Sequence, residues 1–274
     1  MFSRTLKLHW EYTPGATIWR VHPAVRGRIL GEERDVERKQ VSFFALEMVT
    51  GAVLWHKPGV GDPWWVGMDR VAGDYIFLHG FATPDLPVKR GVTVLAAVTG
   101  EHLWSREEWS TEKLDEGVLT VREERREGPV LLLVDARTGS VLGEDRAQEK
   151  TAQPFEDYLA YVGYPAVLSV AELQVHQSGR FVAQQWPVDR LAGPIELFEH
   201  PAYVVIAAHE RKEKGAQAAF VHHLCVVKRN TGTRVYRDII AASATGLGMD
   251  TFFVQDNVLV YVRERMTLCA VSLG

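Results

Sequence analysis

A short segment, His222-His223-Leu224-Cys225, combines imidazole and thiol groups of the kind that bind zinc or copper. On a β-strand, His223 and Cys225 would share one face and His222 would lie on the other. Two soft ligands fall short of the four that a closed structural zinc site requires. We therefore interpret the segment as part of a packed sheet. The G-x-G of Gly246–Asp250 lacks a third glycine and a following helix, which argues against dinucleotide binding.

Acidic residues offer a second kind of chemistry. Asp69, Glu156, Asp157 and Asp250 would hold a divalent cation such as calcium if the fold brought them together around a central channel. In this alternative the protein is hydrolase-like or binds a ligand at that cation. The sequence has no P-loop, G-x-S-x-G, H-E-x-x-H or EF-hand pattern, so no catalytic motif supports it.

Two adjacent tryptophans, Trp64 and Trp65, are candidates for binding. If they lie on an inner strand, one ring packs between sheets and the other is exposed near the channel or the upper face. Exposed aromatic side chains are typical of ligand and partner sites. Together with Asp69 and Asp250 they form the set of predicted binding residues. Packing of both rings in the core is nevertheless the favoured interpretation, and exposure of one ring is the alternative.

Charged runs indicate where a protein partner would bind. They are EERDVERK (Glu32 to Lys39), REERRE (Arg122 to Glu127) and ERKEK (Glu210 to Lys214), and the proline-rich segment Ala82–Gly91 belongs to the same predicted class of loop. Their charges alternate in sign, so no strong field of one sign steers a ligand. They form either a solvated face or a protein-docking face. Because loops vary without disturbing a rigid core, we expect any partner to bind there.

The elements that must position these residues are marked by a repeat. A Thr-Gly pair follows an apolar run at Thr50-Gly51, Thr99-Gly100, Thr138-Gly139 and Thr231-Gly232. The flanking runs alternate with period 2 and are rich in Val, Leu, Phe and Tyr, which predicts strands. Glycine supplies the positive φ of a tight hairpin turn. The aromatic residue that ends the second strand, such as Trp55 or Trp104, needs a neighbouring sheet to cover it.

Two weaker copies of the turn occur at Ser178-Gly179 and at Gly274. A period of roughly 40 to 50 residues, with several strands in each unit, is typical of β-propellers. We therefore predict an all-β protein in which residues 1–274 form a single six-bladed β-propeller with four antiparallel strands per blade. Five blades, seven blades and an open stack of two sheets remain alternatives, because residues 150–188 are poorly marked.

The N-terminal segment LKLHWEY (Leu6 to Tyr12) fits the last unit. The last unit stops at its turn, and His9-Trp10 has the register of Leu54-Trp55 and Leu103-Trp104. We expect the N-terminal strand to complete the last blade, which would close the ring and remove an open sheet edge.

The segment ALEMVTGAVLW resembles the tryptophan-docking repeat of quinoprotein-type, PQQ-like β-propellers. That repeat has Ala first, an acid third, Gly seventh and Trp eleventh, and here these are Ala45, Glu47, Gly51 and Trp55. The resemblance implies the architecture. Many PQQ-like propellers are binding scaffolds, so it also favours a binding role.

The quinone chemistry of this superfamily does not fit the chain. Quinoprotein dehydrogenases have eight blades, a calcium-held quinone and a ring of adjacent cysteines, whereas Cys225 and Cys269 are far apart here. We expect no PQQ and no other cofactor, with calcium required only by the enzymatic alternative. The two cysteines are expected to be buried free thiols.

Composition limits the classes of partner. The 274 residues are 46% hydrophobic and 24% charged, and a net charge of −4 argues against a dedicated nucleic-acid binder. No apolar run approaches the roughly 18 residues that span a bilayer, and residues 1–15 lack the apolar core of a signal peptide. We expect a monomeric cytoplasmic protein, or a periplasmic one if a leader has been removed. The leading hypothesis is a non-enzymatic scaffold that binds a protein, with no nucleic-acid or membrane partner.

Overall fold

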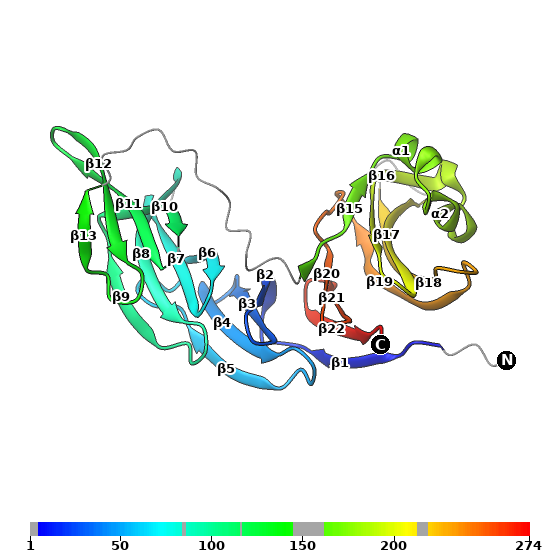
Figure 1. Ribbon diagram of the computed structural model, residues 1–274, viewed down its shortest axis with the longest axis horizontal. Coiled ribbons are helices and arrows are strands. Elements are labelled where there is room, and N and C mark those ends of the chain that lie inside the picture. The colour runs from blue at the N-terminus through cyan, green and yellow to red at the C-terminus, as the bar shows by residue number, and fades with distance from the viewer. Residues whose placement is uncertain (1–4, 84–85, 116, 145–161, 213–218) are drawn as a thin grey trace. The chain divides into compact units, whose positions relative to one another are not determined.

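A computed structural model describes residues 5–83, 86–115, 117–144, 162–212 and 219–274. The chain forms two compact units (Figure 1). One is Gly15–Ala160, and the other combines Met1–Pro14 with Tyr161–Gly274. Each unit is built almost entirely of antiparallel sheets, which confirms the predicted all-β class.

The Gly15–Ala160 unit contains three four-stranded sheets, each with its strands in chain order. The first consists of β2 (Thr17–Ala24), β3 (Arg28–Asp35), β4 (Gln40–Glu47) and β5 (Val53–Pro58). The second consists of β6 (Gly67–Ala72), β7 (Tyr75–Thr83), β8 (Leu86–Ala96) and β9 (His102–Arg106). The third consists of β10 (Trp109–Asp115), β11 (Val118–Arg125), β12 (Gly128–Asp135) and β13 (Val141–Glu144).

The other unit contains two five-stranded sheets and two short helices. One sheet runs β15 (Ala166–Leu168), β16 (Leu191–Glu199), β17 (Tyr203–Arg211), β18 (Phe220–Lys228) and β19 (Arg234–Ala244). The second runs β1 (Leu8–Tyr12), β22 (Thr267–Ser272), β21 (Val258–Arg263), β20 (Phe252–Gln255) and β14 (Val162–Gly163). The helices are α1 (Val170–Val175) and α2 (Gly179–Gln185), followed by a 3₁₀ turn at Val188–Arg190. None of the helices in the described residues is long and apolar enough to cross a membrane.

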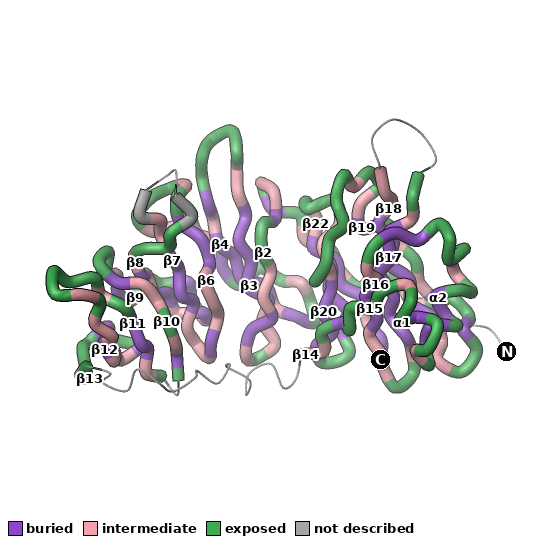
Figure 2. Tube along the Cα trace, turned by 90° about the horizontal axis from the view of Figure 1, so that it is seen from above, coloured by how far each residue is buried: buried purple, intermediate pink, exposed green. Residues whose placement is uncertain are grey.

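Alternating side chains pack each sheet against its neighbours. On β7, Ile76 and Leu78 face the first sheet, while Phe77 faces the third. Burial is therefore concentrated along the strands, and the turns are exposed (Figure 2). Because both faces of the middle sheet are covered at this point, residues 75–78 of β7 form a continuous apolar run.

The Thr-Gly pairs form the predicted turns. Their glycines all have positive φ: Gly51 at 72°, Gly100 at 66°, Gly139 at 70° and Gly232 at 71°. In two of these turns an acidic side chain, Glu47 or Asp135, accepts backbone N–H groups of the turn, as where Asp135 accepts those of Arg137 and Thr138. Hydrogen bonds from Thr138 hold the pKa of Asp135 below its usual value. The acid at the third position of the repeat is therefore part of the turn.

Trp55 explains why the glycine recurs. Its indole Nε1–H donates to the carbonyl of Ala97 at 3.1 Å, and its ring lies on Gly100, where a Cβ would come within 2.8 Å of ring atoms. A tryptophan that ends one sheet thus docks on the turn of the next sheet. The predicted cover for this aromatic is confirmed.

Trp104 repeats the arrangement one sheet further along. Its Nε1–H donates to the carbonyl of Ala136 at 2.9 Å, and its ring lies on Gly139. At Gly232 the place above the glycine is taken by α2, whose Gln185 amide donates to the Gly232 carbonyl at 3.3 Å. Helix packing replaces the docked tryptophan at this turn.

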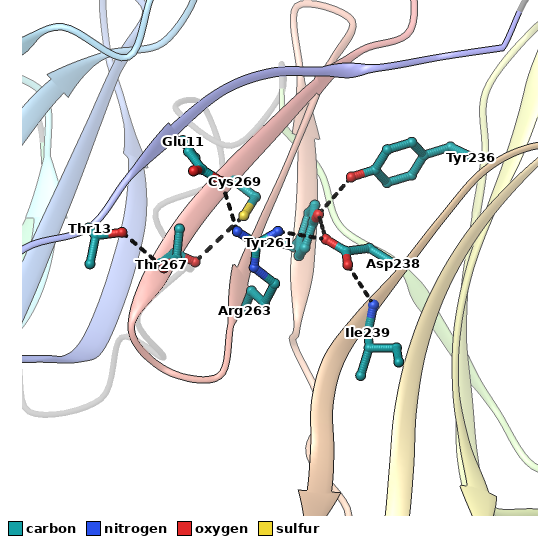
Figure 3. A network of polar contacts seen from close by, with 9 residues as sticks. All are labelled: Glu11, Thr13, Tyr236, Asp238, Ile239, Tyr261, Arg263, Thr267 and Cys269. Atoms are coloured by element: carbon teal, nitrogen blue, oxygen red, sulfur yellow. Dashed lines mark hydrogen bonds and ion pairs between the residues drawn. The ribbon is translucent and has the colours of Figure 1, made fainter.

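The N-terminal strand joins the last sheet, as predicted. β1 pairs antiparallel with β22, with Trp10 opposite Ala270. The Arg263 guanidinium holds Glu11 at 2.8 Å and Asp238 at 3.2 Å, and so ties β1, β21 and β19 together (Figure 3). Tyr261 also donates to Asp238, and burial together with this bond raises the pKa of Tyr261.

The prediction of a strand turn at Ser178-Gly179 is wrong, because this segment is helical. Ser169 and Glu172 form a capping box that starts α1, and Gly179 begins α2 so close to α1 that a Cβ would overlap the Leu173 carbonyl. The described residues therefore contain five sheets, where six blades were predicted.

The placement of the charged runs in loops is also wrong in part. Glu32 and Glu33 are buried residues of β3, and Arg122–Arg125 belongs to β11. Glu210 and Arg211 end β17, while residues 213–214 lie outside the described residues. Most of Ala82–Gly91 belongs to β7 and β8. These strands can include charged residues because each charged side chain either points toward solvent or forms an ion pair. The strands therefore extend further along the chain than expected.

Candidate binding site at Trp65

The segment from Val60 to Val66, which connects β5 to β6, is held by two side chains. Asp62 Oδ1 accepts the backbone N–H groups of Trp64 at 2.8 Å and Trp65 at 2.6 Å. Arg34 donates to the carbonyls of Trp64 at 3.2 Å and Val66 at 2.7 Å. These bonds make the segment a fixed turn that presents its side chains from the edge of the sheet.

A buried ion pair supports this turn. Glu32 has no exposed surface and binds Arg34 Nε at 2.7 Å, while its other oxygen accepts the backbone N–H of Met68 at 2.7 Å. Both oxygens of the carboxylate are therefore used, as a buried charge requires. The acid at the start of the first charged run fixes the start of β6.

The two tryptophans separate, as in the alternative to core packing of both rings, although for a different reason than strand alternation. Trp64 packs partly buried against the core, with Arg34 and Lys39 cations over its ring at 5.4 Å and 4.7 Å. Trp65 remains 37% exposed and meets Phe81 edge to face at 6.0 Å. Both lie in the bend before β6 rather than on a strand, so the Asp62 turn separates them and strand alternation does not.

A pocket of about 570 Å³ opens beside Trp65. It lies between the 60–66 segment and residues of β7, β8 and β9. Gly91 leaves space on the sheet surface, since a Cβ there would meet nothing closer than 3.8 Å, and it sits at φ 86° where the β7–β8 register shifts. At Gly80 a Cβ would come within 2.9 Å of the Arg90 carbonyl, so this glycine allows the two backbones to approach closely. The volume is in the range typical of ligand sites.

The pocket combines apolar walls with polar groups. Trp65, Phe81 and Val66 supply the apolar part, whereas Thr93 and Ser105 supply hydroxyls. Thr93 Oγ1 lies 2.9 Å from Ser105 Oγ, which lies 2.7 Å from His102 Nε2. The lining thus contains a linked chain of hydrogen-bonding groups beside two aromatic rings.

Four charged residues complete the lining: Asp62, Arg90, Arg106 and Glu107. Arg106 lies over the Trp109 ring at 5.5 Å and donates to the Ser105 carbonyl at 2.9 Å. Arg90 is exposed, and it forms no ion pair with any residue that the structure describes. Arg90 is therefore the lining cation with its donors most available to a ligand.

Asp69, the predicted acidic partner of these tryptophans, is not in the lining of the pocket. Its carboxylate, only 8% exposed, is bound by Lys89 at 2.6 Å and Arg70 at 3.1 Å. Burial alone would raise the pKa of Asp69, but the bonds to Lys89 and Arg70 outweigh burial and lower it. Nearby, burial and the charge of Lys89 lower the pKa of His79 to about 4. The aspartate acts as a counter-ion within its own sheet.

Asp250 belongs to the other compact unit and is exposed, with φ at 55°. It precedes Thr251, whose N–H donates at 3.0 Å to Glu196, a buried carboxyl whose pKa is raised by burial. Glu156 and Asp157 lie outside the described residues. Among the residues that the structure covers, no three acidic, histidine or cysteine side chains are grouped as metal ligands.

The His222–Cys225 segment lies in β18 with the predicted alternation. His222 stacks on His209 with ring centroids 3.8 Å apart, while His223 binds Glu210 at 3.0 Å on the other face. Cys225 is buried, and burial raises the pKa of its thiol to about 12. Both cysteines are free and buried, as expected.

Only Arg90 of the polar lining falls in a segment singled out from the sequence, Ala82–Gly91. Thr93 and Ser105 were missed, because they come from β8 and β9 and no motif links them. One signal was present: Gly91 interrupts an apolar strand pattern, and glycine in a strand often marks a bulge or an open surface.

Comparisons with known proteins give a partial match. Residues 25–104 match a family described as a domain of unknown function (DUF4905), which is less than half of the chain. This range includes most of the pocket lining, except Ser105 to Glu107. No curated protein matches the chain.

Similar solved structures include an uncharacterized protein, lmo1340, from Listeria monocytogenes EGD-e. It has 8% identity and a TM-score of 0.36, covering 92% of this chain and 94% of the other. A second is BBS1N, in complex with ARL6DN and soaked with lead, at 10% identity and a TM-score of 0.35, covering 100% of this chain and 98% of the other. TM-scores this low carry no argument about fold or function.

Proposed function

We propose that this protein is a non-enzymatic binding protein of the propeller type and that its recognition site is the Trp65 pocket. The observation that carries the proposal is an exposed tryptophan, edge-on to Phe81, beside a pocket of about 570 Å³ whose Arg90 is available to a ligand. Exposed aromatic and arginine side chains in a concave site are typical anchors for recognition.

A protein partner is favoured because a second surface of aromatic and cationic side chains lies in the same compact unit, outside the pocket lining. Arg34 lies between Trp64 and Trp19, at 5.4 Å and 5.3 Å from the two rings, and Trp19 is 49% exposed. Lys39, from the β3–β4 turn, extends the same surface. This turn and the ends of β7 and β8 belong to the loop class in which partner binding was predicted, so the surface supports that expectation.

The ring itself is part of the proposal. Docking of Trp55 and Trp104 on successive Thr-Gly turns supports the likeness to PQQ-like propellers, and pairing of β1 with β22 supports closure through the N-terminal strand. The sheet count and the helical Gly179 segment support the five-bladed alternative over six blades.

A comparative capture experiment tests the binding site. The tagged full-length protein, its Trp65→Ala variant and its Leu103→Ala variant would be used to capture proteins from the source lysate, with quantification by mass spectrometry. Leu103 is the matched control because its exposed fraction, 37%, equals that of Trp65 and it lies outside the pocket lining. We expect proteins that are retained by Leu103→Ala and lost by Trp65→Ala. If the two variants capture the same set as the unmodified protein, the pocket is not the recognition site.

A further inference from the structure

We propose that the pocket binds an acidic peptide segment, with one carboxylate at Arg90 and a neighbouring apolar side chain against Trp65 and Phe81. This inference rests on the proposed function and specifies its ligand. Three features of the lining support it: the Arg90 guanidinium, the linked hydroxyl groups of Thr93 and Ser105, and the two aromatic rings.

The charges around the pocket favour a single anion. The Asp62 carboxylate accepts hydrogen bonds from two backbone N–H groups. Lys89, which precedes Arg90 on β8, forms an ion pair with Asp69. Arg90 carries a planar set of donors that matches a carboxylate. Asp62 and Glu107 both keep their negative charges in the lining, and these would repel a second nearby carboxylate. A segment with one acidic residue therefore fits better than a polyacidic run.

The hydroxyl chain offers a second donor. When His102 Nε2 donates to Ser105, the Ser105 hydroxyl can donate to Thr93, and the Thr93 hydroxyl hydrogen is then available. Thr93 lines the pocket together with Arg90, so the two can bind different oxygens of one carboxylate. Charge-assisted bonds of this kind are the strong ones in recognition.

The apolar part of the site explains why a bare anion is insufficient. Trp65 and Phe81 meet at 6.0 Å in an edge-to-face arrangement and leave their outer surfaces to the pocket, beside Val66. An aliphatic side chain would remove this surface from water. A peptide segment supplies both groups at once, a carboxylate for Arg90 and an aliphatic side chain for these rings.

Indole NMR of the ¹⁵N-tryptophan-labelled protein tests the inference, with the Trp65 signal assigned from a Trp65→Phe variant. The ligands are N-acetyl-aspartyl-leucinamide, its neutral counterpart N-acetyl-asparaginyl-leucinamide, and sodium acetate. We expect the aspartyl peptide to shift the Trp65 signal and to bind at least about tenfold more tightly than the asparaginyl peptide and acetate. Arg90→Gln and Thr93→Val should each weaken the aspartyl peptide, and Arg126→Gln, an exposed arginine outside the lining, should leave its affinity unchanged.

The outcomes separate this inference from the proposed function. Equal affinity for the two peptides would overturn the preference for an anion while the pocket remained the binding site. Acetate binding as tightly as the aspartyl peptide would overturn the peptide assignment. No shift of Trp65 by either peptide at about 10 mM would overturn the inference, and the proposed function would fail with it only if capture also survived Trp65→Ala.

Discussion

Docking of Trp55 on Gly100 makes a quantitative prediction. In Gly100→Ala, a residue with a side chain must adopt φ 66°, which costs about 1–2 kcal/mol. The new Cβ would lie 2.8 Å from ring atoms of Trp55, so the ring must move and its bond to the Ala97 carbonyl is lost, at about 1 kcal/mol. With some loss of packing, we expect the free energy of unfolding to fall by about 3 kcal/mol, measured by urea denaturation.

The control for this prediction is Gly73→Ala. Gly73 also has positive φ, 55°, but a Cβ there meets nothing within 4 Å, so only the same backbone cost of about 1–2 kcal/mol is expected. In a Trp55→Phe background, Gly100→Ala should cost less than it does in the unmodified protein, because the indole bond is already absent. Equal destabilisation by Gly100→Ala and Gly73→Ala would refute the docking argument.

Three further predictions follow from the packing. Deleting residues 1–12 removes β1 and the Glu11–Arg263 ion pair, so the melting temperature should drop, and an unchanged value would contradict the role of the N-terminal strand. Glu32→Gln leaves the partly buried Arg34 without its counter-ion and should cost about 3 kcal/mol in unfolding free energy, whereas the exposed Glu124→Gln should stay within about 0.5 kcal/mol. Burial lowers the pKa of His222 to about 3, and the charges of His209 and His223 contribute to this shift. Between pH 6.5 and pH 3, the His222 imidazole is therefore protonated in the unfolded state but not in the folded state. Stability should therefore fall as the pH drops below 6.5, by up to about 1.4 kcal/mol per pH unit for this group, and His222→Phe should reduce the slope in denaturation measured across this range.

The sequence predicts those parts of the fold that depend on local chemistry. Gly51 and Gly100 mark turns because positive φ excludes most other residues, and Trp55 and Trp104 need cover because an exposed indole is costly. The Ser178-Gly179 pair looks like another turn, but Ser169 and Glu172 cap a helix just upstream. That capping box was visible in the sequence, and the repeat pattern concealed it.

The candidate site was predictable only in part. Trp65 was identified because it is adjacent to Trp64, so that one of the two rings could point away from the core. Its orientation depends on Asp62 and on the Glu32–Arg34 pair, which lies about thirty residues earlier in the chain. Asp69 was chosen for its charge, and that charge is neutralised by Lys89 from a different strand. Long-range pairing of this kind has no periodic signature in a single sequence.

The central claim is that a partner is recognised through Trp65. The most direct measurement is the affinity of one purified captured partner for the unmodified protein, Trp65→Ala and Leu103→Ala, by isothermal titration calorimetry at constant salt. We expect Trp65→Ala to weaken binding by about tenfold or more and Leu103→Ala to change it by less than about twofold. Equal affinities for all three proteins would contradict the claim.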